Sequence, residues 1–114
     1  MVIKKVALYL RKSREEESES REATLARHER MLRDYCAKNN LVIVEVYKEV
    51  VSGENLDARP EARRMLDAVA DKEFEGVVVV ELERLSRGNQ IDQVEILETF
   101  KKSGTKIYTL NKTY

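Results

Sequence analysis

The residues best suited to chemistry in this sequence are arginines and serines in three short polar segments. These segments are Tyr9-Leu10-Arg11-Lys12-Ser13-Arg14, then Ser52-Gly53 with Arg59-Pro60, and then Leu82-Glu83-Arg84-Leu85-Ser86-Arg87-Gly88. An arginine guanidinium presents a planar fork of donors that suits phosphate oxygens. A serine hydroxyl among several guanidinium groups could accept a phosphoryl group, because the arginines would stabilise the charge spread over the transferring phosphate.

Each feature also has an ordinary structural explanation. An Arg-x-Ser sequence after a strand is usually a solvated loop, and Ser52-Gly53 alone is typical of a turn. Arg84 and Arg87 lie three residues apart and would fit a charged surface equally well. His28 and Cys36 fall on or near an apolar stripe, where a packing role is more common than a chemical one. The functional interpretation therefore depends on the combination of segments.

The composition excludes several classes of protein. The 114 residues suit a single domain. Lys plus Arg and Asp plus Glu are 21 each, and this zero net charge excludes a polycationic nucleic-acid coat and an acidic tail. One cysteine excludes a disulfide framework, and a single histidine disfavours a zinc centre. No apolar run reaches the ~18 residues of a membrane span, and no signal peptide is recognisable, so we expect a cytoplasmic protein without a membrane partner.

The elements that must position the three segments alternate between strands and helices. Apolar runs predict strands at residues 6–10, 41–47, 76–80 and 106–110, and stripes of helical spacing predict helices at 24–39, 60–70 and 91–103. This β-α-β-α-β-α-β order predicts an α/β fold with a mainly parallel sheet and helices on both faces. We expect residues 11–20, which include no apolar side chain, to form an exposed, mobile loop. All three polar segments follow strands, and functional sites of such folds gather at the carboxyl ends of strands.

The three segments together resemble the serine recombinases, the family of the resolvases and invertases and of the large serine integrases and transposases. The resemblance rests on Tyr9-x-Arg11-x-Ser13, on Ser52-Gly53 with Arg59-Pro60, and on residues 82–87, in order and at compatible spacing. It covers the whole chain and is strongest for the large serine branch. It implies a resolvase-like fold and a DNA recombinase, with roles in DNA integration or transposition within a mobile element.

The resemblance also implies roles for individual residues. Ser13 would be the nucleophile that attacks a DNA phosphodiester, forming a 5′-phosphoserine bond and releasing a 3′-hydroxyl. Arg11, Arg84 and Arg87 would be catalytic arginines that bind the phosphate. Arg59 would bind phosphate or support the site, and so would Ser52. The family uses no metal and no other cofactor, because the phosphoserine bond keeps the energy needed for rejoining.

Two positions depart from the family pattern. Glu83 stands where the family usually has Asp, so its carboxylate extends roughly one C–C bond further. His28 stands where the family often has Gln; it could donate a hydrogen bond to phosphate, with a charge that depends on pH. The resemblance places both residues among the supporting or phosphate-binding groups.

The chain is also shorter than the family pattern. We expect one catalytic domain, residues 1–114, truncated before the long helix that assembles dimers and tetramers and before the DNA-binding domains. DNA would then be contacted through the full-length parent, and the isolated fragment would be inactive. Without that helix, apolar side chains at residues 91–100 and 107–110 are expected to be exposed.

Two alternatives stay open. One is a recombinase-like module for binding or assembly whose catalysis is impaired by Glu83 and His28. The other is an unrelated α/β signalling or nucleotide-binding domain, although the sequence has neither a P-loop nor a Gly-x-Gly-x-x-Gly motif. An arginine cluster around Ser13 would favour the recombinase, and an acidic pocket at the strand ends would favour a signalling domain.

Overall fold

A computed structural model describes residues 4–13, 21–51, 59–81, 85 and 90–110. Strands and helices alternate along the chain, as the sequence predicts. In order, the elements are β1 (Lys4–Ser13), α1 (Arg21–Lys38), β2 (Leu41–Val51), α2 (Pro60–Ala70), β3 (Gly76–Val78), α4 (Gln90–Ser103) and β4 (Lys106–Tyr108).

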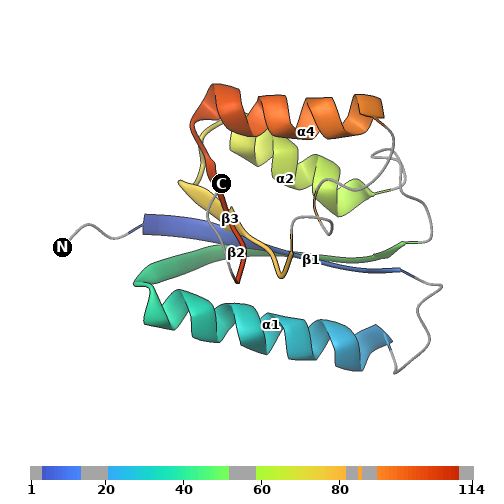
Figure 1. The fold of residues 1–114 in the computed structure, drawn as a ribbon, viewed down its shortest axis with the longest axis vertical. Helices are drawn as coiled ribbons and strands as arrows, with labels where there is room; N and C mark the ends of the chain where they lie inside the picture. The colour runs from blue at the N-terminus through green and yellow to red at the C-terminus, as the bar shows by residue number, and fades with distance from the viewer. Residues whose placement is uncertain (1–3, 14–20, 52–58, 82–84, 86–89, 111–114) are drawn as a thin grey trace.

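The four strands form one sheet in the order β2-β1-β3-β4, and every neighbouring pair is parallel. The helix α1 covers one face of this sheet, and α2 and α4 lie side by side on the other (Figure 1). The predicted α/β class, the parallel sheet and the helices on both faces are confirmed. Because all strands run the same way, their carboxyl ends meet at one edge.

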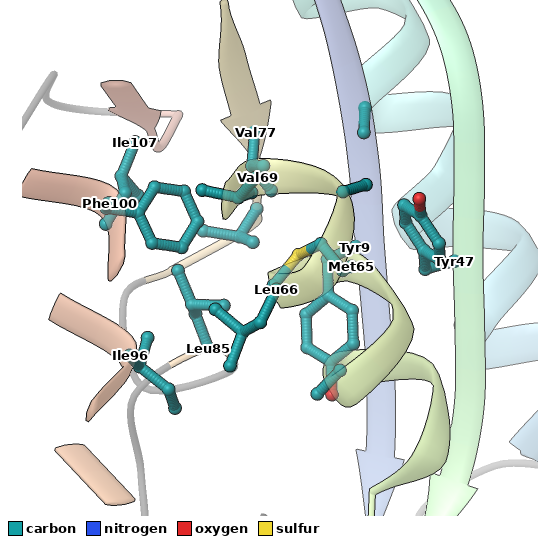
Figure 2. Close-up of a cluster of buried hydrophobic side chains, with 14 of the residues drawn as sticks. Tyr9, Tyr47, Met65, Leu66, Val69, Val77, Leu85, Ile96, Phe100 and Ile107 are labelled. Atoms are coloured by element: carbon teal, nitrogen blue, oxygen red, sulfur yellow. The ribbon is translucent and has the colours of Figure 1, made fainter. Parts of the chain in front are cut away.

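Each face of the sheet has its own apolar core. On the α2 and α4 face, side chains of the sheet, both helices and Leu85 pack into one core, which includes Tyr9, Met65, Leu66, Val69, Val77, Leu85, Ile96, Phe100 and Ile107 (Figure 2). On the α1 face the buried residues are Val6, Leu8, Leu10, Leu25, Leu32, Cys36, Val78 and Tyr108. Burial of these side chains removes apolar surface from water, which is the main force that holds the helices on the sheet.

The strand β2 contains a bulge that changes which of its side chains face α1. Val6 pairs with Ile43, but Ala7 pairs with Glu45, so Val44 has no partner on β1. Before the bulge, Ile43 packs against the α1 core; after it, Val46 does so. The extra residue therefore reverses the alternation of faces along the strand.

Local chain chemistry explains where the elements begin and end. Pro60 is the first residue of α2, where its missing N–H costs nothing. Asn40 after α1 and Gly104 after α4 have φ values of 58° and 72°, the left-handed conformation that ends helices. Gly76 of β3 lies against the Tyr108 ring, and a Cβ at this position would collide with it.

Two predicted strand boundaries were wrong at the carboxyl edge of the sheet, where the polar segments lie. Residues 11–13 were expected in an exposed loop, but β1 continues through Ser13, and Arg11 and Lys12 are buried. Likewise β2 continues to Val51 instead of ending at Tyr47. The two strand ends pair with each other, and this ladder of backbone hydrogen bonds outweighs the polar character of the side chains. The strands β3 and β4, in contrast, are shorter than predicted.

The expected exposure of apolar residues is confirmed for part of α4, where Ile96 and Phe100 are instead buried, and is wrong on β4. Val94 and Leu97 of α4 are exposed. Ile107 and Tyr108 of β4 are buried, because α4 and the two cores cover this edge strand. Within the described ranges, every helix is too short or too polar to cross a membrane.

Candidate active site

The carboxyl ends of β1 and β2 lie side by side, and in the sequence the second predicted segment begins directly after β2. Ser13 pairs with Val51, the residue that precedes Ser52 in the sequence, and Arg11 pairs with Glu49. Paired residues of parallel strands point to the same side of the sheet, so Arg11 and Glu49 are neighbours on the α2 side, together with Tyr9. The predicted proximity of these two segments is thus a property of the strand register.

Charged side chains are buried at this edge. Four are buried in the described part of the chain: Arg11, Lys12, Glu49 and Arg59, at 5%, 2%, 8% and 0% exposed. They come from the ends of β1 and β2 and from the residue before α2. By the alternation of faces, Arg11 lies with Glu49 and Arg59 on the α2 side, whereas Lys12, paired with Val50, lies on the α1 side. The strand end that bears Ser13 therefore has a cationic side chain on each face of the sheet.

The best-defined part of the site is a buried network around Arg59. Its Nε and Nη2 donate hydrogen bonds to the Tyr9 hydroxyl at 3.2 and 3.0 Å, and Nη2 donates to the Leu85 carbonyl at 2.8 Å. The guanidinium also lies over the Tyr9 ring, 5.5 Å from its centroid. The Tyr9 hydroxyl in turn donates to Glu49 Oε2, which lies 4.0 Å from Arg59 Nε. The network links β1, β2, the start of α2 and Leu85.

Glu49 completes this network by capping α2 from a neighbouring strand. Its Oε1 accepts the backbone N–H of Glu61 at 3.0 Å, and its Oε2 accepts that of Ala62 at 3.2 Å. These N–H groups belong to the first turn of the helix, where no intrahelical acceptor exists. Arg59 occupies the N-cap position without a side-chain cap, so Glu49 supplies the missing acceptor and a negative charge at the positive end of the helix.

Burial fixes the protonation state of Tyr9. It raises the pKa of the Tyr9 phenol well above its ordinary value; the positive charge of Arg59 opposes this rise, and the negative charge of Glu49 adds to it. The hydroxyl therefore stays protonated at neutral pH. It can accept hydrogen bonds from Arg59 while it donates one to Glu49.

The remaining candidates on α1 are buried. His28 is 8% exposed, and Thr24, one turn earlier, is 2% exposed. The Thr24 Oγ1 atom has no hydrogen-bond partner among the described residues. Cys36 is buried in the α1 core, where the apolar stripe predicts it, and burial raises the pKa of its thiol to about 11.

Four predicted site residues lie outside the described residues: Ser52, Glu83, Arg84 and Arg87. For Ser13 the structure describes the backbone, which ends β1. The predicted convergence of Arg84 and Arg87 on Ser13 therefore stays a prediction. Within the described ranges, no three His, Cys, Asp or Glu residues gather in a way that could hold a metal ion.

Two members of the network, Tyr9 and Glu49, were not predicted as site residues. Tyr9 belongs to the motif that carries the family resemblance, but its apolar surroundings suggest only a core residue. Glu49 does leave a signal in the sequence. It lies two residues after Tyr47 in a mostly apolar strand and three residues before Ser52, so it shares the face of Tyr47 in a strand that leads to the site.

Comparison with solved structures identifies the class to which this fold and edge belong. A C-terminal catalytic domain of ISC1926 TnpA, an IS607-like serine recombinase, is 24% identical with a TM-score of 0.77, over 95% of this chain and 70% of that one. The N-terminal catalytic domain of TP901-1 integrase is 25% identical with a TM-score of 0.74, over 95% of this chain and 78% of that one. A resolvase family site-specific recombinase from Streptococcus pneumoniae is 23% identical with a TM-score of 0.75, over 94% and 72%. The fold is that of serine recombinase catalytic domains.

The family follows from the sequence itself. The family model "Resolvase, N terminal domain" matches residues 6–114, and the chain belongs to this family. The resemblance seen in the three polar segments is confirmed.

Proposed function

We propose that this chain is the catalytic domain of a site-specific serine recombinase that cleaves and rejoins DNA through Ser13. The observation that carries the proposal is the end of β1. Ser13 is the last residue of β1, at the carboxyl edge of the parallel sheet, and Arg11 and Lys12 directly precede it in the same strand. Cationic side chains next to a serine hydroxyl suit a phosphodiester, because arginine and lysine bind phosphate oxygens.

The reaction would be a transesterification at phosphorus. The Ser13 Oγ forms a bond to the phosphorus as its own proton leaves, and the bond from phosphorus to the DNA 3′ oxygen breaks. The 3′ oxygen takes up a proton, and a 5′-phosphoserine remains. Rejoining reverses these steps, with a 3′-hydroxyl attacking the phosphoserine and the proton returning to Ser13.

The arginines would supply electrostatic stabilisation. Arg11, Arg84 and Arg87 are proposed to bind the non-bridging oxygens, whose negative charge grows in the transition state. Arg59, Ser52, Glu83 and His28 are proposed as supporting groups. Phosphoryl transfer depends mostly on such positioning and charge, so the chain's own side chains would be sufficient.

The proposal includes a larger assembly. We propose that the domain acts in the cytoplasm within a longer polypeptide, whose further segments bind DNA and assemble dimers or tetramers. The exposed Val94 and Leu97 of α4 support a role in assembly, because exposed apolar side chains that lie near each other favour association.

A covalent trapping experiment tests the proposal. The full-length recombinase is incubated with fragmented genomic DNA, denatured, and the protein-linked DNA is recovered and sequenced at the junction. Wild-type protein should give an adduct on the 5′ end and a free 3′-hydroxyl that a polymerase can extend. Ser13→Ala should give no adduct and bind DNA with nearly unchanged Kd, because the hydroxyl does chemistry and not recognition.

Ser103→Ala is the matched control, since Ser103 ends α4 and its hydroxyl bonds locally to Thr105 and the Phe100 carbonyl. This variant should form the adduct at the wild-type rate. An adduct that persists in Ser13→Ala would contradict the assignment of the nucleophile.

A further inference from the structure

Arg59 is placed where it cannot reach DNA in this conformation. Its side chain is fully buried. Its guanidinium donates to the Tyr9 hydroxyl and to the Leu85 carbonyl, both inside the protein. An arginine that binds a DNA phosphate must present its N–H donors to the solvent from which the DNA approaches. The position of Arg59 therefore indicates a role different from that of an exposed phosphate-binding arginine.

Among the described residues, three contacts fix the orientation of this guanidinium: those with the Tyr9 hydroxyl, the Tyr9 ring and the Glu49 carboxylate. The Tyr9 hydroxyl accepts a hydrogen bond from the guanidinium and donates one to Glu49. Glu49 is itself immobilised, because both of its oxygens accept backbone N–H groups from the first turn of α2. A planar guanidinium held over the Tyr9 ring on one side and hydrogen-bonded at its edge has little freedom to rotate.

The fourth contact connects this network to the third polar segment. Leu85 is fully buried in the core formed with α2 and α4, and its carbonyl accepts from Arg59 at 2.8 Å. In the sequence Leu85 stands directly after Arg84 and two residues before Arg87. Whatever holds the Leu85 carbonyl therefore anchors the chain between the two arginines of this segment.

We propose that Arg59 acts in strand cleavage as a positioning residue, held by Glu49 and Tyr9, and that it fixes Leu85 instead of binding phosphate. The proposal rests on the function proposed above and refines it. By the same argument Glu49 and Tyr9 are positioning residues, because they act on Arg59, which in turn holds Leu85. Loss of any of the three should disturb the geometry of cleavage without removing a contact to DNA.

Chemical labelling of arginines tests where Arg59 lies. Phenylglyoxal modifies accessible guanidinium groups, and peptide mass mapping reports each arginine separately. In the wild-type protein Arg59 should stay unmodified with and without DNA, while the exposed Arg64 is modified. In Glu49→Gln, which keeps the shape but loses the charge, Arg59 should become modified at least tenfold faster. Glu95→Gln, which removes an exposed partner of Arg63, is the matched control and should leave Arg59 protected.

Cleavage kinetics test what the network does. Glu49→Gln, Tyr9→Phe and Arg59→Lys should each slow adduct formation by about 10²-fold, the effect of a misplacement of about 1 Å, with Kd for DNA unchanged. Glu95→Gln should react at the wild-type rate. Each variant is assayed well below its unfolding temperature, so that lost stability does not lower the rate. A purely structural network would leave the rate constant unchanged under these conditions.

Two results would overturn the inference. One is wild-type Arg59 that reacts with phenylglyoxal like Arg64 and is protected by DNA, as a phosphate ligand would be. The other is a Glu49→Gln variant that forms the adduct at the wild-type rate. A wild-type protein that gives no adduct at all contradicts the proposed recombinase function instead, and the labelling then still decides whether Arg59 is held inside the protein.

Discussion

The two faces of the sheet are held in different ways. The α1 face has an apolar layer that includes Leu8, Leu32 and Cys36, with the polar side chains of Lys12, Thr24 and His28 also buried there and a pair of Glu29 with Lys48 at the rim. The α2 and α4 face combines a similar apolar layer with the buried network of Arg59 and Glu49. Apolar contacts accept small displacements, whereas hydrogen bonds to a buried charge require fixed geometry. The hydrogen-bonded network of Arg59 and Glu49 therefore holds its side chains in a more definite geometry than the apolar layers do.

The largest effect is expected from Arg59→Leu on the network face. Removing one member of a buried charge pair should lower the free energy of unfolding by about 4 kcal/mol. The Leu85 carbonyl also loses a donor. Urea unfolding followed by circular dichroism measures this loss. Arg63→Leu, at an exposed pair with Glu95, should cost less than about 1 kcal/mol. Equal losses in the two variants would mean that the buried network adds no stability of its own.

On the α1 face, the free energy of unfolding should depend on the volume of the apolar side chains. Leu32 is fully buried, and Leu32→Ala should lower the free energy of unfolding by about 3 kcal/mol through lost burial and a cavity. Leu32→Met, which conserves volume, should cost less than about 1.5 kcal/mol. The same urea titration applies. A conservative Arg59→Lys should not be tolerated in this way, and a mild Arg59→Lys beside a severe Leu32→Met would reverse the comparison.

Tyr9→Phe should lower the free energy of unfolding by about 2 kcal/mol at pH 7, because a buried hydroxyl between two charged groups is lost. The pKa of Tyr9 is raised by burial in the folded state. Its contribution is therefore complete below the unfolded pKa, about 10, and is lost as pH rises through the folded pKa. The stability advantage of wild type over Tyr9→Phe should shrink above pH 10 by up to about 1.4 kcal/mol per pH unit. Urea midpoints at pH 8 to 11.5 measure it, and a constant difference across this range would contradict the assignment.

The smallest effect is expected at the rim of the α1 face. Hydrogen bonding from Lys48, together with Arg33, holds the pKa of Glu29 below its usual value. Its stabilising contribution is present above the unfolded pKa, about 4.3, and is lost as pH falls through the folded pKa. Glu29→Gln should cost less than about 1 kcal/mol at pH 7. This cost should decrease further in 0.5 M salt, and a cost that ignores salt would indicate a buried interaction instead.

The sequence was sufficient to predict the fold because hydrophobic periodicity reports burial. The four strands, the three helices and the stops at Asn40 and Gly104 follow from apolar spacing and turn chemistry. The ends of β1 and β2 were missed because Arg11 and Lys12 are polar, and periodicity reads polar residues as exposed. Their burial results from pairing with residues about 38 positions away, which no local pattern contains.

The site was only partly predictable for the same reason. Motif spacing led to Arg11, Ser13 and Arg59, but the contacts of Arg59 depend on a strand register and a helix start. Glu49 looks like an ordinary acidic residue until its carboxylate is seen at the first turn of α2. A motif gives the types of groups at a site, while the tertiary structure decides which of them are accessible.

The bulge at Val44 has a consequence for how this sequence can vary. The extra residue shifts the second half of β2 by one position, so the two halves of the strand direct opposite sets of alternate side chains toward α1. Tyr47 and Glu49 face α2 only because the extra residue, Val44, precedes them in the strand. Deleting one residue between Ile43 and Glu45 would leave the strand as hydrophobic as before, yet would turn the carboxylate that caps α2 toward α1. Insertions and deletions in the first half of β2 would therefore change which side chains face α2 at the candidate active site, although they lie far from it along the strand.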